Sequence, residues 1–179
     1  MTTLLVATRK VGATSYTFDW GEEIEAERRL LDSEATRENF DSVAKDYDVI
    51  IVLSHGRKDK VWSDVDGEAL IDNHNIKQLS GKKLCIIACD AGKCLALKKG
   101  PSLVVAFDGP FVFMPPKETI FRKFVKELGN GFCHRAVGDI IWELMEGRMD
   151  PYVRRAMVHN ISHLVVIKEG KLLTRFKPL

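Results

Sequence analysis

The sequence has no long hydrophobic run. None of its apolar stretches approaches the roughly 18 residues that a membrane-spanning helix requires. The N-terminal segment MTTLLVATRK has only a short apolar stretch, and positive charge follows this stretch rather than preceding it, unlike in a secretory signal peptide. We therefore expect a cytoplasmic protein with no membrane partner, whose thiols are kept reduced.

The sequence also lacks an excess of charge of one sign. It has 27 basic and 25 acidic residues and a net charge of +2. Its basic pairs are scattered along the chain, whereas a nucleic-acid-binding surface requires basic residues clustered on one face. We therefore expect no nucleic acid among its partners.

Motifs for several kinds of chemistry are absent. There is no glycine-rich phosphate-binding loop and no G-x-S-x-G motif, so nothing supports nucleotide binding or a serine hydrolase. His159 and His163 have the i, i+4 spacing of metal ligands on a helix. The segment NISHLVV predicts, however, that a helix changes into a strand between them, and no acidic residue or cysteine with matching spacing lies nearby. We expect neither a metal site nor a cofactor.

What the sequence does contain is an alternation of strand and helix patterns. Its 179 residues suffice for one domain, with a core at about residues 3–128 and C-terminal helices and a hairpin at about 132–177. The predicted fold class is α/β, a three-layer sandwich with a mainly parallel central sheet and a C-terminal β-hairpin. Continuous apolar runs predict four strands buried on both faces: Thr3–Thr8, Val49–Leu53, Lys83–Ala88 and Leu103–Phe107.

Helices are predicted from apolar residues at helical spacing and from capping residues. The first is Glu34–Asp46 with Ser33 as its cap, and the last begins at Asp150–Pro151. Residues 17–20 are expected in an edge strand or a loop. The remaining helices and the two hairpin turns are expected at Asp72–Leu79, Lys93–Lys99, Lys117–Leu128 and about His134–Glu146, and at Asp66–Gly67 and Glu169–Gly170.

A thiol and an imidazole follow two of the predicted strands. Val49–Leu53 is followed by SHG, which contains His55 and Gly56, and Lys83–Ala88 is followed by CDAG, which begins with Cys89. Functional groups gather at the carboxyl ends of parallel strands, and the ends of neighbouring strands lie about 5 Å apart. A cysteine nucleophile requires a histidine that forms the thiolate or protonates the leaving group. The pattern therefore predicts a catalytic dyad.

Packing is the alternative explanation for both residues. Cysteine is among the most buried residue types, and a histidine after a strand often only closes a turn. Cys85 lies inside a predicted strand and is expected in the core, and Cys133 gives no functional signal. Cys94 could form a redox-sensitive disulfide with Cys89, although C-x-x-x-x-C is not a thioredoxin-type spacing. The order of the two motifs, each with its own glycine, favours the dyad.

The motifs LSHG, residues 53–56, and IIACDAG, residues 86–92, resemble those of the caspase-like cysteine peptidases (clan CD). This superfamily includes caspases, metacaspases, separase, clostripain and CHAT domains. The C-x-x-G spacing is closer to CHAT domains, clostripain and metacaspases than to the caspase signature. In element order the resemblance extends from Thr3 to about Leu128. It implies that Cys89 is the nucleophile, that His55 is the general acid and base, and that the amides of Gly56 and Cys89 form the oxyanion hole, without a cofactor.

The chain departs from the family pattern at two positions. Ala91 stands where family members often have serine or threonine. Ile87 lies two residues before Cys89, where relatives specific for basic residues carry an acid and caspases carry glutamine. An apolar side chain offers no ionic partner, which favours a substrate with an uncharged residue before the scissile bond. Asp108, just after a predicted strand, is the alternative determinant of specificity.

Four residues are candidates for a substrate pocket: Ile87, Asp90, Asp108 and Phe111. Phe111 belongs to the segment FVFMPP, which could wall a substrate groove or fold back over the core. The acidic residues that follow His55 either form a solvated loop or supply a group that orients the imidazole: they are Asp59, Asp64, Asp66 and Glu68.

The expected function is that of a cysteine endopeptidase that cleaves peptide bonds through a thioester acyl-enzyme. The alternative is a non-catalytic caspase-like module that binds a protein partner or serves as a regulatory scaffold. Relatives are commonly controlled by partners, processing or dimerisation. The expected partners are therefore a protein or peptide substrate and, in addition, an activating protein or a second copy of the chain.

Overall fold

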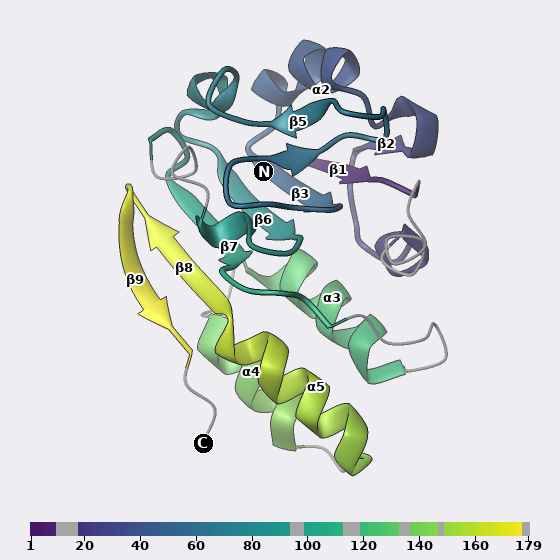
Figure 1. Cartoon of the computed structure of the whole chain (residues 1–179), viewed down its shortest axis with the longest axis vertical. Helices are drawn as coiled ribbons and strands as arrows, with labels where there is room; N and C mark the ends of the chain where they lie inside the picture. The colour runs from purple at the N-terminus through teal and green to yellow at the C-terminus, as the bar shows by residue number, and fades with distance from the viewer. Residues whose placement is uncertain (10–17, 94–98, 113–118, 133–136, 147–148, 177–179) are drawn as a thin grey trace.

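A seven-stranded sheet with the order β2-β1-β3-β6-β7-β8-β9 forms the centre of the molecule (Figure 1). The computed structural model describes residues 1–9, 18–93, 99–112, 119–132, 137–146 and 149–176. The first five strands in this order, β2, β1, β3, β6 and β7, run parallel to one another. Strand β8 is antiparallel to β7, and β9 is antiparallel to β8. The predicted α/β class with a mainly parallel central sheet is confirmed. The strands are β1 (Thr3–Ala7), β2 (Arg28–Leu31), β3 (Val49–Leu53), β6 (Lys83–Ile87), β7 (Leu103–Phe107), β8 (Leu164–Lys168) and β9 (Lys171–Arg175).

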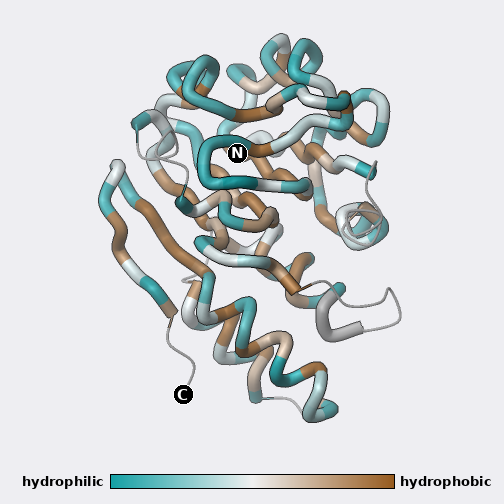
Figure 2. Tube along the Cα trace, in the orientation of Figure 1, coloured by the Kyte–Doolittle hydropathy of each residue, from teal (hydrophilic) through white to brown (hydrophobic). Residues whose placement is uncertain are grey.

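Helices cover both faces of the sheet (Figure 1), and the central strands consist largely of hydrophobic residues (Figure 2). Successive residues of a strand point to opposite sides, so Ile51 and Ile87 belong to one apolar cluster and Val52 and Ile86 to another. Helices α3, α4 and α5 pack on the first face, and α2 with a small second sheet packs on the other. The molecule therefore has three layers. The helices are α2 (Arg37–Val43), α3 (Thr119–Gly131), α4 (Val137–Glu146) and α5 (Pro151–Ser162).

Both predicted hairpins are confirmed. The small sheet is the antiparallel pair β4 (Val61–Trp62) and β5 (Ala69–Ile71), and its turn includes Gly67 at a φ of 77°. The turn between β8 and β9 consists of Glu169 and Gly170, both with positive φ. Two positive φ values are the signature of a type I′ turn, whose twist matches that of the strands.

The start of helix α2 differs from the prediction. Helix α2 begins at Arg37 because Thr36, not Ser33, caps it: the Thr36 hydroxyl accepts a hydrogen bond from Asn39 N at 3.2 Å. The predicted cap of α5 is confirmed, since Asp150 accepts from Tyr152 N at 2.8 Å. Several short segments are 3-10 helices: η1 (Asp32–Glu34), η2 (Ala44–Asp46), η3 (Ile76–Leu79) and η4 (Ala91–Lys93).

One strand was not predicted. The edge strand β2 pairs with β1, whereas the described residues 18–20 of the segment 17–20, expected in an edge strand or a loop, are helical. Helix α3 also continues past the predicted end at Leu128 to Gly131. Residues 94–98 of the predicted helix Lys93–Lys99, together with Cys94, Cys133 and most of FVFMPP, lie outside the described residues.

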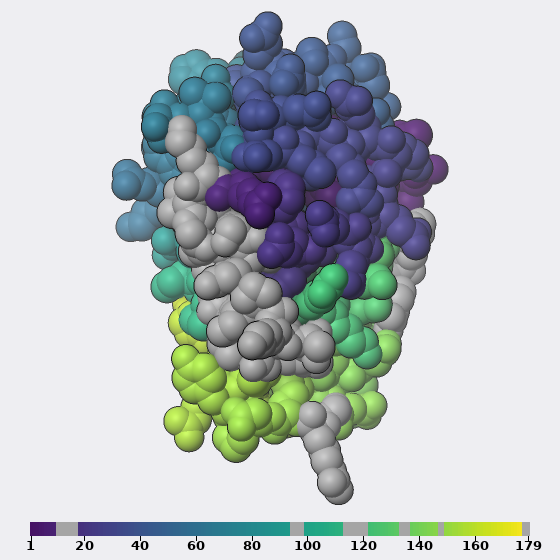
Figure 3. All heavy atoms as spheres, turned by 90° about the vertical axis from the view of Figure 1, so that its right-hand side faces the viewer, coloured from purple at the N-terminus to yellow at the C-terminus, as the bar shows by residue number. Residues whose placement is uncertain are grey.

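The two ends of the molecule come from different parts of the chain. In Figure 3 later residues of the first half of the chain, coloured blue to teal, cover one end and the C-terminal helices cover the other. No helix in the described part of the chain is long and apolar enough to cross a membrane.

Candidate functional site

The carboxyl ends of β3 and β6 lie side by side, and they carry His55 and Cys89. The two strands pair in parallel as far as Leu53 and Ile87, so His55 and Cys89 each follow two residues later. Ser54 N continues the ladder by donating to Ile87 O at 3.2 Å. The predicted adjacency of the two strand ends is confirmed.

Each motif glycine is required by close packing. A Cβ added at Gly56 would lie 2.3 Å from the Cys89 carbonyl oxygen, so no side chain fits between the two strand ends. A Cβ at Gly92 would lie 2.6 Å from a Val165 methyl group and 3.1 Å from the Phe107 carbonyl. Neither glycine has a positive φ. Their role is to allow the turn of one strand to approach its neighbour.

The Cys89 sulfur contacts the segment that follows β7. Phe111 N donates a hydrogen bond to Cys89 Sγ at 3.2 Å, and Phe111 O lies 3.9 Å from the same sulfur. Cys89 is half-buried, whereas Cys85 in the middle of β6 is completely buried. The thiol of Cys89 is therefore the more accessible of these two.

Burial dominates the environment of the His55 imidazole. Its Nε2 atom is buried and has no hydrogen-bond partner among the described residues. Burial lowers the pKa of His55 below its ordinary value of 6.5, because a buried imidazolium loses its hydration. His55 also lines a cavity of about 350 Å³ together with Trp62, Asp64 and Asp66. The histidine is therefore held neutral at pH 7.

His55 and Cys89 are not hydrogen-bonded to each other. The sulfur accepts from Phe111 N, and the imidazole Nε2 has no partner in the part of the chain that is described. The backbone N–H groups of Gly56 and Cys89 donate no hydrogen bond to any described residue. The structure brings the predicted residues to one edge of the sheet without the dyad contact.

A sharp turn directs the chain away immediately after Cys89. Asp90 has a φ of 54°, a left-handed conformation that costs a non-glycine residue energy. Its backbone N donates to Gly109 O at 2.9 Å, and its carboxylate pairs with Lys93 at 2.5 Å. These bonds stabilise the turn, so Asp90 supports the position of Cys89.

The other predicted pocket residues have defined surroundings. Ile87 is completely buried in the core under the site, and Phe111 is buried with its ring edge-on to Phe107. Asp108 is also buried, and its carboxylate accepts from Arg175 at 2.6 Å and lies 3.3 Å from His163 Nδ1. The charge of Asp108 is thus already paired within the chain.

His159 on α5 and His163, the residue that follows the helix, contact each other. Helix α5 ends at Ser162, between the two histidines as predicted, yet their rings lie 4.8 Å apart and edge-to-face. His159 Nε2 lies 3.0 Å from Pro110 O, and His163 Nδ1 faces Asp108. Within the described ranges no group of three or more metal-ligating side chains could hold a metal ion.

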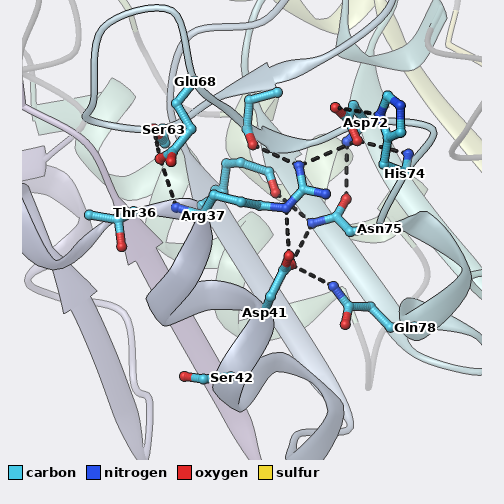
Figure 4. Close-up of polar contacts among 12 residues, drawn as sticks. Thr36, Arg37, Asp41, Ser42, Ser63, Glu68, Asp72, His74, Asn75 and Gln78 are labelled. Atoms are coloured by element: carbon cyan, nitrogen blue, oxygen red, sulfur yellow. Dashed lines mark hydrogen bonds and ion pairs between the residues drawn. The ribbon is translucent and has the colours of Figure 1, made fainter.

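A polar network that the sequence did not reveal fixes the hairpin that follows His55 (Figure 4). Arg37 on α2 donates to Asp41 at 2.6 Å and to Ala69 O at 2.9 Å, and its second ion-pair partner is Asp72 at 3.3 Å. Asp41 also accepts from Asn75 at 2.6 Å. The network thus attaches α2 to β5 and to the start of η3.

The acidic residues after His55 do not all have the same role. Glu68 accepts from Ser63 Oγ at 2.6 Å and from Arg37 N at 2.8 Å, so it belongs to the hairpin network (Figure 4). Asp59 lies 3.9 Å from Lys60, an exposed contact. Only Asp64 and Asp66 line the cavity beside the histidine.

Replacing Arg37 by alanine is expected to destabilise the protein by about 2–3 kcal/mol, because partly buried acceptors lose a charged donor. The measurement is the free energy of unfolding in urea. Arg28→Ala, which removes an exposed arginine on β2, serves as the control and should change stability little. Equal stabilities of the two variants would contradict a structural role for the network.

The pH dependence of stability provides a test of the buried imidazole. Below pH 6.5 the unfolded chain binds a proton at His55 while the folded chain does not, because its pKa is lowered. Stability therefore falls as the pH decreases from 6.5 toward the folded pKa. His55→Gln should reduce the loss of stability between pH 7.5 and 5.5, measured by urea unfolding, whereas His74→Gln, at a side chain 87% exposed, should not. An unchanged slope in His55→Gln would contradict the burial.

Comparisons with known proteins do not extend this description: no protein-family model matches the chain, and no curated protein matches it.

Proposed function

We propose that the chain is a cysteine peptidase of the caspase-like type, with Cys89 as nucleophile and His55 as general acid and base. The observation that carries this proposal is the shared position of the two residues at the ends of adjacent parallel strands. The packing of Gly56 against the Cys89 carbonyl supports it, because it holds the two ends together. The caspase-like fold and clan remain part of the same proposal.

The proposed reaction has two steps. His55, neutral at pH 7, takes the thiol proton, and the Cys89 sulfur forms a bond to the scissile carbonyl carbon. The amides of Gly56 and Cys89 donate to the resulting oxyanion. His55 then gives its proton to the departing amine as the C–N bond breaks, which leaves a thioester. Water, deprotonated by His55, attacks the thioester and releases the acid and the free thiol. The chemistry uses no cofactor.

The proposed substrate is a protein or peptide with an uncharged residue before the scissile bond. Ile87 offers no charge, and the carboxylate of Asp108 is engaged by Arg175, so neither residue provides a free ionic partner. An alternative cleavage preference for basic residues would require Arg175 to leave Asp108.

We propose a cytoplasmic location, without nucleic acid or membrane partners.

Digestion of a proteome-derived peptide library tests this function. Cleavage sites are read by mass spectrometry, and a sample quenched in acid is searched for an acyl group on the peptide that contains Cys89. We expect cleavage with a transient adduct at Cys89. Cleavage without dependence on Cys89 would assign the activity to another mechanism and contradict the proposal.

One observation favours a second candidate, a module that acts by binding a protein. His55 and Cys89 are not hydrogen-bonded, and a vestigial dyad would have the same feature. An activating partner or a second copy could also complete the site. Thiol reactivity distinguishes the two functions, because an assembled nucleophile reacts much faster than a packing cysteine. A Cys89 that is alkylated no faster than an ordinary accessible cysteine would favour the binding module.

A further inference from the structure

Two consecutive residues of α5 hold the backbone segment that contacts the Cys89 sulfur. Asn160 binds both backbone groups of Val112: its Oδ1 accepts from Val112 N at 2.8 Å, and its Nδ2 donates to Val112 O at 3.0 Å. His159 Nε2 lies 3.0 Å from Pro110 O, and since a carbonyl oxygen only accepts, this nitrogen is the donor. The segment is thus fixed before and after Phe111.

The contact of His159 acts on the same peptide unit that meets the sulfur. Pro110 O and Phe111 N belong to one peptide group, whose oxygen accepts from His159 and whose N–H donates to Cys89 Sγ. Hydrogen bonds in such a chain polarise one another. The N–H that faces the thiol is therefore both oriented and made a better donor.

The burial of Asn160 indicates a specific role for its amide. Asn160 is completely buried, and its neighbours on the buried side of α5 are apolar: Val153, Ala156, Met157 and Ile161. A buried amide costs free energy unless it is hydrogen-bonded, and both bonds of this amide are to Val112. A leucine of similar size would suffice if packing were the only requirement.

We propose that Asn160 is a positioning residue: it holds the segment after β7 so that Phe111 N–H donates to Cys89 Sγ and stabilises the thiolate. The effect follows from charge, because an anionic acceptor forms a stronger hydrogen bond than a neutral thiol. The role in catalysis rests on the proposed function of Cys89. The effect of Asn160 on the Cys89 thiol does not depend on that proposed function, because it concerns only the protonation and the reactivity of the thiol.

Alkylation of Cys89 by iodoacetamide between pH 5.5 and 9.5, mapped by peptide mass, tests the proposal. Loss of one hydrogen bond to the sulfur leaves the thiolate less stabilised, and the slower alkylation that results is partly offset because a less stabilised thiolate is a better nucleophile. Asn160→Leu should therefore slow alkylation at neutral pH about threefold to tenfold and move the rate curve to higher pH. The titratable and charged residues around the site are unchanged in this variant: His55, Asp90, Lys93, Asp108, His159, His163 and Arg175.

Ser162→Ala is the matched control. It removes a hydrogen bond within the same helix end, from Ser162 Oγ to His159 O, and leaves the Val112 contact intact. Its alkylation curve should coincide with that of the wild type. A folded Asn160→Leu protein with the wild-type curve would overturn the proposal.

A second pair of variants applies if Asn160→Leu fails to fold. Phe111→Ala removes the ring and keeps the N–H, whereas Phe111→Pro removes both. Slower alkylation of Cys89 in the proline variant than in the alanine variant supports the proposal, and equal rates overturn it. These readings use no peptide substrate. If the chain cleaves no peptide but its variants show the expected change in Cys89 alkylation, the proposed peptidase function is contradicted. The proposed positioning role of Asn160 is then still supported.

Discussion

Replacing Cys89 by alanine is expected to abolish peptide cleavage, a loss of at least about 10⁴-fold in kcat. Without the sulfur there is no thioester, and the amide bond must be attacked directly by water. The loss should be confined to chemistry, because the half-buried side chain has only the Phe111 backbone as hydrogen-bond partner among the described residues. The measurement is the rate of product release from a peptide identified in the library digestion, followed by mass spectrometry.

Two further variants define this result. Cys94→Ala removes the cysteine that follows Cys89 in the sequence and should retain most of the activity. His55→Ala should lower kcat by about 10²–10⁴-fold, the usual contribution of a general acid and base. Wild-type cleavage in Cys89→Ala would contradict the peptidase. A loss in Cys94→Ala as large as that in Cys89→Ala would point instead to a disulfide or redox mechanism.

Gly56→Ala is expected to reduce both the stability of the fold and the rate of cleavage. The added methyl group would lie 2.3 Å from the Cys89 carbonyl oxygen, which is backbone and cannot rotate away. The two strand ends must separate, at a cost of about 2–4 kcal/mol in the free energy of unfolding. The same separation moves His55 and the two amides away from Cys89, so cleavage should fall below about one hundredth of the wild-type rate, since an ångström of misplacement can cost that factor.

Gly138→Ala provides the control for this substitution. A Cβ at Gly138, on α4, would meet only a Phe176 ring atom at 3.7 Å, an ordinary contact. Alanine also favours the helix, so stability should stay equal or rise by up to about 1 kcal/mol. Urea unfolding and cleavage rates are measured on both variants. A loss seen in Gly56→Ala but not in Gly138→Ala is caused by crowding at the strand ends and not by the addition of a methyl group as such. Wild-type stability of Gly56→Ala would contradict the close packing.

The sheet could be predicted because its strands carry uninterrupted apolar runs. Val49–Leu53 was predicted with its observed bounds, and Leu103–Phe107 likewise. The edge strand β2 was missed because its sequence, RRLL, begins with two arginines and buries only one residue. The cap of α2 was misplaced because Ser33 and Thr36 are chemically similar, and only the backbone conformation distinguishes them.

The candidate site was only partly visible in the sequence. The strand patterns placed His55 and Cys89 on one edge, since the order of elements suffices for that. The contact of Cys89 with Phe111 depends on the path of a loop 22 residues away, which no local pattern encodes. Asn160 did give a signal, a polar residue among apolar ones in AMVHNIS, but its partner Val112 lies 48 residues away in the chain.

The hairpin β4–β5 has a consequence for how relatives of this chain could differ from it. It lies between His55 and Cys89 in the sequence, but it is not part of the seven-stranded sheet. In that sheet β3 and β6 pair directly with each other. Insertions at its tip, around Gly67, would lengthen the interval between the two motifs without moving them apart, because the cost of a longer loop grows slowly. Divergent relatives should therefore keep the two short motifs at their strand ends while the number of residues between them drifts freely.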